Sequence, residues 1–216
     1  MLAWMLGWSL SLATLLIPST NERLLAHYWL VMFMMVVSLI QAVEGAMWYN
    51  FNHANLPHRT NLLTRLVAMA LWLQPLTHCV GLLLFGPASY WLIIYVVGMS
   101  FACLSIMSEV FGEEAQRWTT FIGPNSHLVW CAKLLDQNFF TYTPLFSQGD
   151  WGRVYQIGLL FPIFFFPDLR ILILLVGGTT FLYARSKSVY GEIPSHWCIL
   201  SVSITLVPFV AYLLSI

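Results

Sequence analysis

The segment "SLIQAVEGAMWYN", residues 38–50, decides the fold, because it lies inside an apolar run at about 25–49 that is long enough to cross a bilayer. It also carries an amide, Gln41, and a carboxyl group, Glu44. A charged side chain in a membrane helix is costly and usually faces a protein interior or a cavity. The segment therefore predicts a membrane helix with a polar site on its inward side.

The composition of the whole chain agrees with this interpretation. The chain has 216 residues, of which 59% are hydrophobic and 8% are charged, whereas a soluble domain is about 25% charged. The apolar runs do not alternate with polar residues, which favours helices over a barrel. We therefore expect an all-α fold, a polytopic transmembrane helical bundle forming one domain over residues 1–216. The net charge of zero gives no indication of nucleic-acid binding.

The apolar runs predict about seven spans, with a long connection at about 112–152 between the fourth and the fifth. The predicted spans are 2–18, 25–49, 62–85, 89–111, 153–166, 169–185 and 195–216. The fifth is short and contains Pro162. We expect parts of the connection to form a short amphipathic helix in the membrane interface, with Trp118, Trp130 and Trp151 at headgroup depth.

The distribution of Lys and Arg predicts the orientation in the membrane. With seven spans, seven of the nine basic residues lie on the side of the N-terminus and two on the other side. Because cytoplasmic loops are enriched in Lys and Arg, we expect a cytoplasmic N-terminus and a C-terminus on the opposite side. Without the fifth span, Arg185 and Lys187 would change sides and the bias would be weaker.

The candidate site begins on the second span. Gln41, Glu44 and Trp48 are spaced i, i+3, i+7 and share one helix face, and Gly45 lets another helix approach closely. Two interpretations stay open: a buried carboxyl group that lines a functional site, with Glu44 as the candidate catalytic residue, or an interhelical hydrogen bond that fixes packing. We expect Glu44 to face the segment "SHWC", residues 195–198.

Further polar residues complete the set of candidates. Gln74 and His78 are spaced i, i+4 in the third span, with Pro75 between them, which frees a backbone carbonyl. A packing role for His78 is the alternative to a binding role. The predicted topology also places several polar residues near the leaflet of Glu44, where they form either one cluster or separate interfacial groups. These residues are Glu109, Tyr183, Arg185, His196 and Trp197.

Metal and cofactor chemistry find little support in the sequence. The six histidines form neither HxxxH nor HExxH, so we expect no metal site. The four cysteines form no CxxC motif and are expected to be small apolar helix residues. The last span contains no lysine for a retinal Schiff base, which excludes a retinal protein. The sequence identifies no cofactor.

Four motifs occur in order along the chain: "QAVEGAMW", "LWLQP", "YQIGLLFPIFFFPDLRI" and "SHWCILSVSI". With these motifs the chain resembles a family of small bacterial seven-span membrane proteins to which no activity is assigned. The resemblance implies the seven-span fold, and the start "GWSLS" departs from the family's Met-Cys-Phe-Ser. It directs attention to Gln41, Glu44, Trp48, His127, Ser195, Trp197 and Cys198.

Three classes of function remain open from the sequence. The first is a small transporter, a channel-like protein or an accessory subunit of a membrane complex, with a buried polar site around Glu44. The second is an intramembrane enzyme that acts on a lipid or isoprenoid, with Glu44 as the acid and aromatic rings facing a carbocation. The third is a purely structural subunit. The expected partners are the lipid bilayer, other membrane subunits or a lipid-like ligand.

Overall fold

The computed structural model of the chain describes residues 2–16, 23–53, 57–85, 89–112, 118–132, 150–165, 167–188 and 193–206. These residues are mostly helical. The longer helices are α1 (Leu2–Leu15), α2 (Arg23–His53), α3 (Pro57–Phe85), α4 (Tyr90–Phe111) and α6 (Pro167–Lys187). Two short helices continue into 3-10 turns: α5 (Asp150–Leu160) into η3 (Phe161–Phe165) and α7 (Ile193–Ser201) into η5 (Val202–Leu206). The strands are β1 (Trp118–Ile122) and β2 (Leu128–Ala132).

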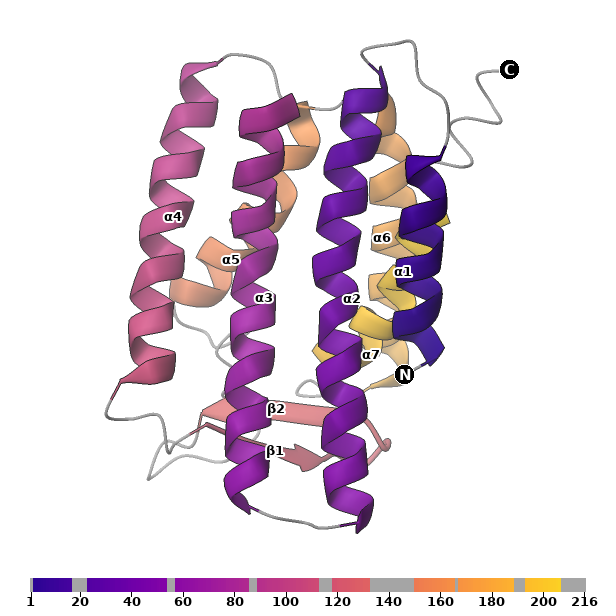
Figure 1. Cartoon of the computed structure of the whole chain (residues 1–216), viewed down its shortest axis with the longest axis vertical. Helices are drawn as coiled ribbons and strands as arrows, with labels where there is room; N and C mark the ends of the chain where they lie inside the picture. The colour runs from indigo at the N-terminus through magenta and orange to yellow at the C-terminus, as the bar shows by residue number, and fades with distance from the viewer. Residues whose placement is uncertain are drawn as a thin grey trace.

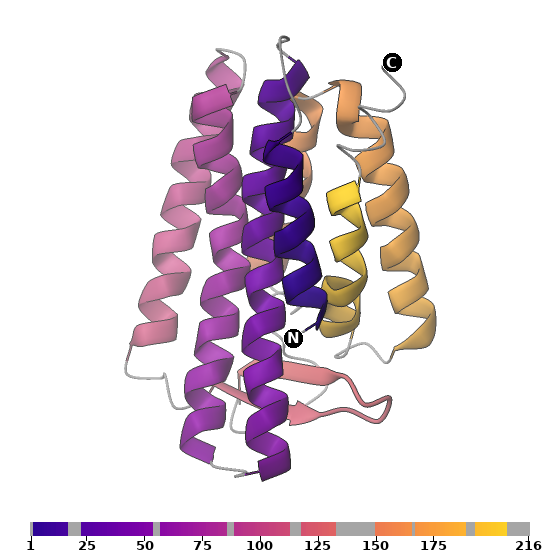
Figure 2. The same ribbon diagram turned by 45° about the vertical axis from the view of Figure 1, so that its right-hand side comes forward.

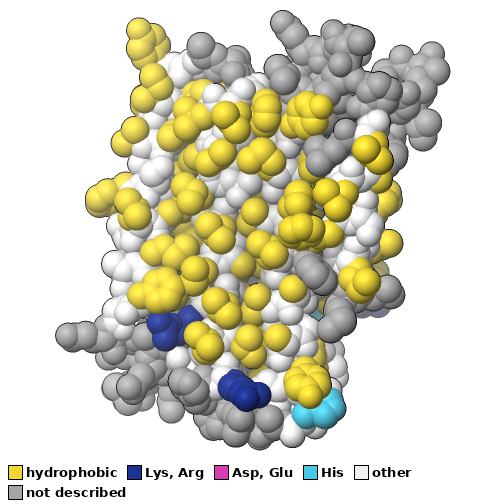
Figure 3. Space-filling view, in the orientation of Figure 1, with side chains coloured by type: hydrophobic (Ala, Val, Ile, Leu, Met, Phe, Trp, Pro, Cys, Tyr) yellow, Lys and Arg dark blue, Asp and Glu magenta, His cyan; other side chains and the backbone are white. Residues whose placement is uncertain are grey.

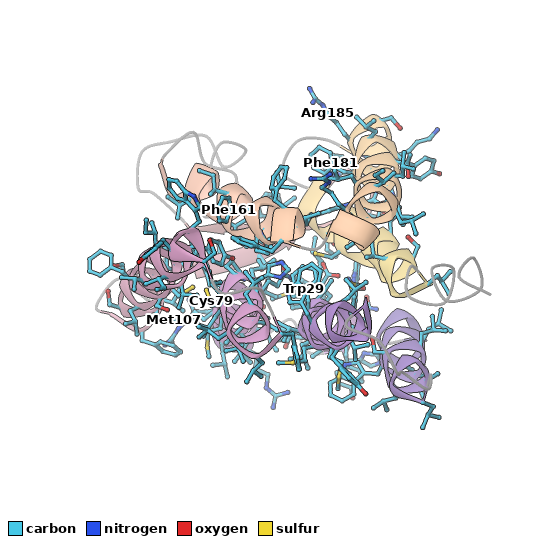
Figure 4. All side chains as sticks on the ribbon, turned by 90° about the horizontal axis from the view of Figure 1, so that it is seen from above. Trp29, Cys79, Met107, Phe161, Phe181 and Arg185 are labelled. Atoms are coloured by element: carbon cyan, nitrogen blue, oxygen red, sulfur yellow. The ribbon has the colours of Figure 1, made fainter. Side chains whose placement is uncertain are left out.

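The helices form two layers. Figure 1 and Figure 2 show α1 to α4 side by side in chain order, with α5, α6 and α7 behind them and the two strands across one end. Seen from above in Figure 4, the side chains of the two layers fill the space between them. The most extensive contacts are those of α2 with α3, of α1 with α2 and of α3 with α4. The core therefore lies between the row of long helices and the shorter second layer.

Three of the helices are long and apolar enough to cross a membrane: Tyr28–His53, Arg59–Phe85 and Tyr90–Ser108. The outward face of α4 exposes large apolar side chains, including Trp91, Ile94 and Phe101. In the view of Figure 3, hydrophobic side chains cover most of the surface, and Lys and Arg side chains lie near the end that carries the strands. Length, hydropathy and surface together identify an integral membrane protein.

A tight contact joins α2 to α3 at the end away from the strands. A Cβ on Gly81 would lie 2.4 Å from Cδ1 of Trp29, so only glycine permits this approach. The Trp29 indole N–H donates to Nδ1 of His78 over 2.9 Å, and Phe33 stacks on the same imidazole with ring centroids 4.0 Å apart. His78 is thus buried between Trp29 and Phe33, with Nδ1 paired and Nε2 without a hydrogen-bond partner among the described residues, and its role in packing or binding stays a prediction.

The connection between α4 and α5 contains a β-hairpin, so the expectation of an amphipathic helix there is wrong for residues 118–132. The strands β1 and β2 pair antiparallel from Trp118 with Ala132 to Ile122 with Leu128. A turn at residues 123–126 joins them, in which Ser126 N–H donates to Gly123 O and Ser126 has a φ of 60°. Trp118 and Trp130 lie in the strands and Trp151 lies in α5; their depth in the membrane stays a prediction. Residues 133–149 lie outside the described part.

The helix α2 is longer than the predicted span of 25–49. Because α2 continues to His53, Glu44 lies nine residues, about two and a half turns, before the end of its helix. The predicted fifth span corresponds to α5 and η3, in which Pro162 lies in the 3-10 turn. Residues 207–216 of the predicted last span lie outside the described residues.

Candidate functional site: a buried polar cluster around Glu44

Six polar or thiol side chains meet between the two helix layers, and we call them the Glu44 cluster. They come from four helices and all are nearly inaccessible, with exposed fractions of 5% or less. The members are Gln41 and Glu44 on α2, Gln74 on α3, Tyr155 on α5, and Ser195 and Cys198 on α7.

The Glu44 carboxyl group is only partly satisfied. The Ser195 hydroxyl hydrogen-bonds to it. Its Oε1 atom is buried and has no hydrogen-bond partner among the described residues, and the same holds for Nε2 of Gln41 one turn earlier on α2. A buried polar atom without a partner costs about 1–3 kcal/mol. The structure thus places an unpaired acceptor and an unpaired donor three residues apart on one helix face.

The short helix α7 supplies the groups that face Glu44. Ser195 and Cys198 are three residues apart and therefore share one face of α7. The Cys198 thiol is close enough to the Glu44 carboxyl group for an electrostatic interaction. On another side of α7, the Trp197 indole N–H donates to Gly177 O and to Thr180 Oγ1 of α6, each over 3.3 Å. Trp197 therefore holds α7 against α6 and positions the face that carries Ser195.

Tyr155 extends the cluster to α5 and α3. Its hydroxyl donates to Gln74 Oε1 over 2.6 Å, and it also interacts electrostatically with Cys198. Because the hydroxyl hydrogen points to Gln74, the Tyr155 oxygen can still accept a hydrogen bond from another group.

A close approach of α5 places Tyr155 in this position. A Cβ on Gly158 would lie 2.5 Å from Cε of Met99 and 3.1 Å from Cβ of Pro75, so the absence of a side chain at residue 158 lets α5 pack closely against α3 and α4. Tyr95 of α4 also donates its hydroxyl to Gly158 O over 2.7 Å. Gly158 lies one turn after Tyr155, and this contact brings the Tyr155 ring to Gln74.

A second polar group lies where the hairpin meets α6 and α7, and we call it the histidine contact. The imidazole rings of His127 and His196 stack with centroids 4.2 Å apart and an interplanar angle of 13°. The ring of Tyr183 lies edge-on to His196 at 5.9 Å, and Ser188 Oγ lies 2.7 Å from Nδ1 of His196. The histidine contact is half-buried and thus closer to solvent than the Glu44 cluster.

The structure separates residues that the sequence placed near one leaflet. The expected partner of Glu44 in "SHWC" is confirmed, because Ser195 bonds its carboxyl group. His196 and Tyr183 belong to the histidine contact instead. Arg185 is exposed on α6 and points away from the bundle in Figure 4. Trp48 is half-buried and packs against the core, while the side chain of Glu109 lies outside the described residues.

Tyr155 is the member of the cluster that the sequence interpretation missed. In the sequence, Tyr155 stands three residues before Gly158, and this spacing alone does not predict a site. The spacing becomes informative only with the structure, in which Gly158 packs against Pro75 and Met99.

One apolar groove competes with the cluster as a candidate site. It has a volume of about 300 Å³, opens to the outside between α2 and α3, and is lined by Met32, Met35, Val36, Leu76, Thr77 and Val80. The Thr77 hydroxyl already donates to Leu73 O over 2.7 Å. The lining of the groove is therefore apolar apart from the Thr77 hydroxyl, whereas the Glu44 cluster combines several polar groups.

Within the described ranges, no three His, Cys, Asp or Glu side chains are grouped so that they could hold a metal ion. Cys79, Cys103 and Cys198 are buried and form no disulfide among the described residues. Comparison with known protein families, with curated proteins and with solved structures found no match to this chain. A function therefore has to be argued from the geometry of the site.

Proposed function

We propose that this chain is a small transporter or channel-like membrane protein in which the Glu44 carboxyl group takes up and releases a proton. In this proposal the seven helices are seven membrane spans, and the end that carries the hairpin faces the cytoplasm. The accessory-subunit role considered from the sequence is compatible with the same site, since a proton path can serve a larger complex.

The observation that supports the proposal is the incomplete hydrogen bonding of Glu44 deep in an apolar helix bundle. Glu44 is 4% exposed, and loss of water is the largest influence on its carboxyl group, ahead of the Ser195 hydrogen bond and the charge of the N-terminal amino group, which both favour the ionised form. An ionised carboxylate whose lost hydration is incompletely replaced is costly to remove from water. We therefore expect Glu44 to be neutral while its surroundings are closed, and to ionise only when water reaches it.

The neighbours of Glu44 suit proton exchange. Ser195 donates a hydrogen bond that stabilises the ionised form. The Tyr155 oxygen and the Gln41 amide provide an acceptor and a donor for water that enters the cluster. A proton moves along hydrogen-bonded groups and needs no cavity of ligand size, which fits the dense packing around Glu44.

If the Glu44–Ser195 hydrogen bond served packing alone, we would expect the neighbouring buried polar atoms to be paired as well. Buried polar groups that serve packing are normally satisfied, because each unsatisfied atom lowers stability. Here Glu44 Oε1 and Gln41 Nε2 have no partners among the described residues, although both lie at the core of the bundle. His78 Nε2 and Asn50 Oδ1 also lack a partner there, so Glu44 is distinguished by its ionisable carboxyl group, which favours a site of proton exchange.

Proton flux into liposomes tests the proposal. Purified protein is reconstituted into vesicles that contain a pH-sensitive dye, and a potassium diffusion potential drives protons inward. We expect flux clearly above that of protein-free vesicles, a loss of at least tenfold in Glu44→Gln, and partial retention in Glu44→Asp, which keeps the carboxyl group.

Ser38→Ala is the matched control on the same helix, because the Ser38 hydroxyl bonds only its local backbone, at Met35 O over 2.9 Å. It should leave the flux unchanged. Flux in wild type no greater than in empty vesicles, or equal flux in Glu44→Gln and wild type, would contradict the proposal.

A further inference from the structure

The long helices α2 and α3 lie side by side in a fixed antiparallel register (Figure 1). Asn50 of α2 donates to the Thr60 hydroxyl of α3 over 3.0 Å near the hairpin, and Trp29 contacts Gly81 near the other end. The two contacts are 21 residues apart on both helices, so positions equally far from them lie at the same height. Glu44 is therefore level with residue 66 of α3, and residue 41 is level with residue 69.

One face of α3 carries buried residues at every third or fourth position along most of its length. These residues are Thr60, Thr64, Val67, Leu71, Gln74 and His78. The face is polar at its two ends and apolar in the middle, at Val67 and Leu71. Glu44 and Gln41 of α2 lie at the height of this middle part. The buried polar side chains of the two helices thus follow one another along the bundle, and we call them the polar column: Thr60, Thr64, Glu44, Gln41, Gln74 and His78.

Polar groups of other elements contact the column along its length. At the hairpin end, Thr64 Oγ1 lies 2.6 Å from Thr120 Oγ1 of β1, and the Thr64 hydroxyl is 2.7 Å from Thr60 O. In the middle, the column receives the hydrogen bonds from α7 and α5 described for the Glu44 cluster. At the far end, the Trp29 indole, which lies between the two layers in Figure 4, donates to His78 Nδ1 over 2.9 Å. The column therefore lies inside the bundle, between its layers.

The polar column is nearly as long as the apolar part of a membrane is thick. From Thr60 to His78 it extends over 18 residues of α3, about 27 Å at 1.5 Å per residue, against about 30 Å for the hydrocarbon core. The widest step, from the height of Gln41 to that of Gln74, is five residues or about 7.5 Å, and the Tyr155 hydroxyl donates to Gln74 there. One water between two polar atoms spans about 5–6 Å, and the side chains cover the rest.

Four side-chain atoms along the column have no hydrogen-bond partner among the described residues, although their residues are at most 4% exposed. They are Asn50 Oδ1 beside Thr60, Glu44 Oε1, Gln41 Nε2 and His78 Nε2. Because Nδ1 of His78 accepts from Trp29, the hydrogen of the neutral imidazole is on Nε2. The four atoms are therefore two acceptors and two donors. Buried waters in proteins bind to such atoms.

We propose that the polar column is the path of the proton through the bundle and that His78 is the residue that positions a water at its far end. Protons pass from the hairpin end through waters at the threonines to the ionised Glu44 and bind at Oε1. After release they pass through waters at Gln41 and Gln74 to the water held by His78 Nε2. Each water accepts one proton as it gives another, so only Glu44 changes its charge. This path rests on the proposed proton exchange at Glu44.

Radiolytic oxidation of the wild-type protein in liposomes tests for water in the column. X-rays convert water into hydroxyl radicals, which oxidise adjacent side chains, and mass spectrometry measures the rate at each residue. Cys198 and Tyr155 adjoin the column and are 5% and 3% exposed; Cys103 and Tyr95 on α4 are 3% and 6% exposed and serve as matched controls. We expect Cys198 and Tyr155 to be oxidised at least fivefold faster than their controls.

Two threonines of α3 give a matched pair for the flux assay. Thr64 in the column and Thr77 in the outward groove each donate to the carbonyl four residues earlier over 2.7 Å, so valine removes the same local bond at both positions. We expect Thr64→Val to lower proton flux at least fivefold and Thr77→Val to leave it unchanged.

Two variants of His78 separate the positioning of water from packing. His78→Gln keeps an N–H donor and should retain much of the flux, whereas His78→Phe keeps a ring that can stack on Phe33 and should lose at least fivefold. A packing role alone would reverse this order, because only phenylalanine preserves the stacked ring.

Wild-type flux in both Thr64→Val and His78→Phe, or oxidation of Cys198 no faster than that of Cys103, would overturn the path. Either result leaves the proposed function standing as long as Glu44→Gln abolishes flux, whereas wild-type flux no greater than that of empty vesicles removes the function itself. The radiolysis needs no variant, so it decides the question even where a substituted protein does not fold.

Discussion

At the scale of single residues, the Glu44 cluster is held by a few specific contacts that reach across four helices. Glu44 depends on Ser195, and Tyr155 depends on Gln74. Among the described residues of the cluster, the hydrogen bond from the Tyr155 hydroxyl to Gln74 Oε1 joins α5 to α3, so removing the hydroxyl leaves a buried amide oxygen without its donor.

Tyr155→Phe should destabilise the protein by roughly 1–3 kcal/mol, because the buried Gln74 Oε1 loses its donor while the ring stays in place. Denaturant unfolding in detergent micelles, followed by circular dichroism, measures the change. Tyr49→Phe is the matched control, since Tyr49 is 63% exposed and should shift stability by less than about 0.5 kcal/mol. Equal stability of the two variants would show that the hydroxyl contact contributes nothing.

At the scale of elements, the position of the short helix α5 depends on a residue without a side chain, Gly158. Gly158 packs against Met99 and Pro75, and a larger residue there requires the Met99 side chain to move aside and the contact with Pro75 to widen. Gly98 on α4 is the opposite case, because a Cβ there would meet nothing within 4 Å.

Gly158→Ala should push α5 away from Pro75, weaken the contact of Tyr155 with Gln74 and destabilise the protein by about 1–3 kcal/mol through overpacking. Gly98→Ala should be neutral or stabilise by up to about 1 kcal/mol, as expected for alanine in a helix interior. Thermal unfolding of both variants in the same micelles gives the comparison. A stable Gly158→Ala protein with unchanged flux would separate α5 from the function of the site.

The long apolar run around Glu44 was sufficient to predict a buried polar helix face. A run of this length and hydropathy forms a membrane helix, and the cost of a charge in lipid turns the carboxyl group towards the protein interior. The hairpin was missed, although "GPNS" at residues 123–126 is a turn signal flanked by β-branched and aromatic residues. The overall apolar composition hid this local signal. The role of Tyr155 could not be predicted from the sequence, because it depends on a contact between α5 and α3, about 80 residues apart in the chain.

At the scale of the whole molecule, the two ends of the bundle differ in chemistry. Arg59 and Arg65 lie in the early turns of α3 at the hairpin end, and Arg65 donates to Val110 O at the end of α4. The opposite end begins α4 with the exposed aromatic side chains of Tyr90 and Trp91. This asymmetry is the structural counterpart of the Lys and Arg bias in the sequence.

Labelling from outside the cell checks the proposed orientation. In intact cells, a maleimide that cannot cross the membrane should label Tyr90→Cys and should not label Arg59→Cys until the cells are permeabilised. Both positions are exposed on the described surface, so a difference in reactivity reports sidedness and not burial. Labelling of Arg59→Cys in intact cells would reverse the orientation.

The Trp29–Gly81 contact has a mechanical consequence for the long helices. Since the indole already lies where a Cβ of residue 81 would be, and its N–H is tied to His78, sliding α2 along α3 would drive the ring into the backbone. The two longest helices are therefore held in register and form one rigid unit. A change of shape in this molecule would have to take place where the short helices pack on this unit, at the contacts of α5 with α3 and of α7 with α2.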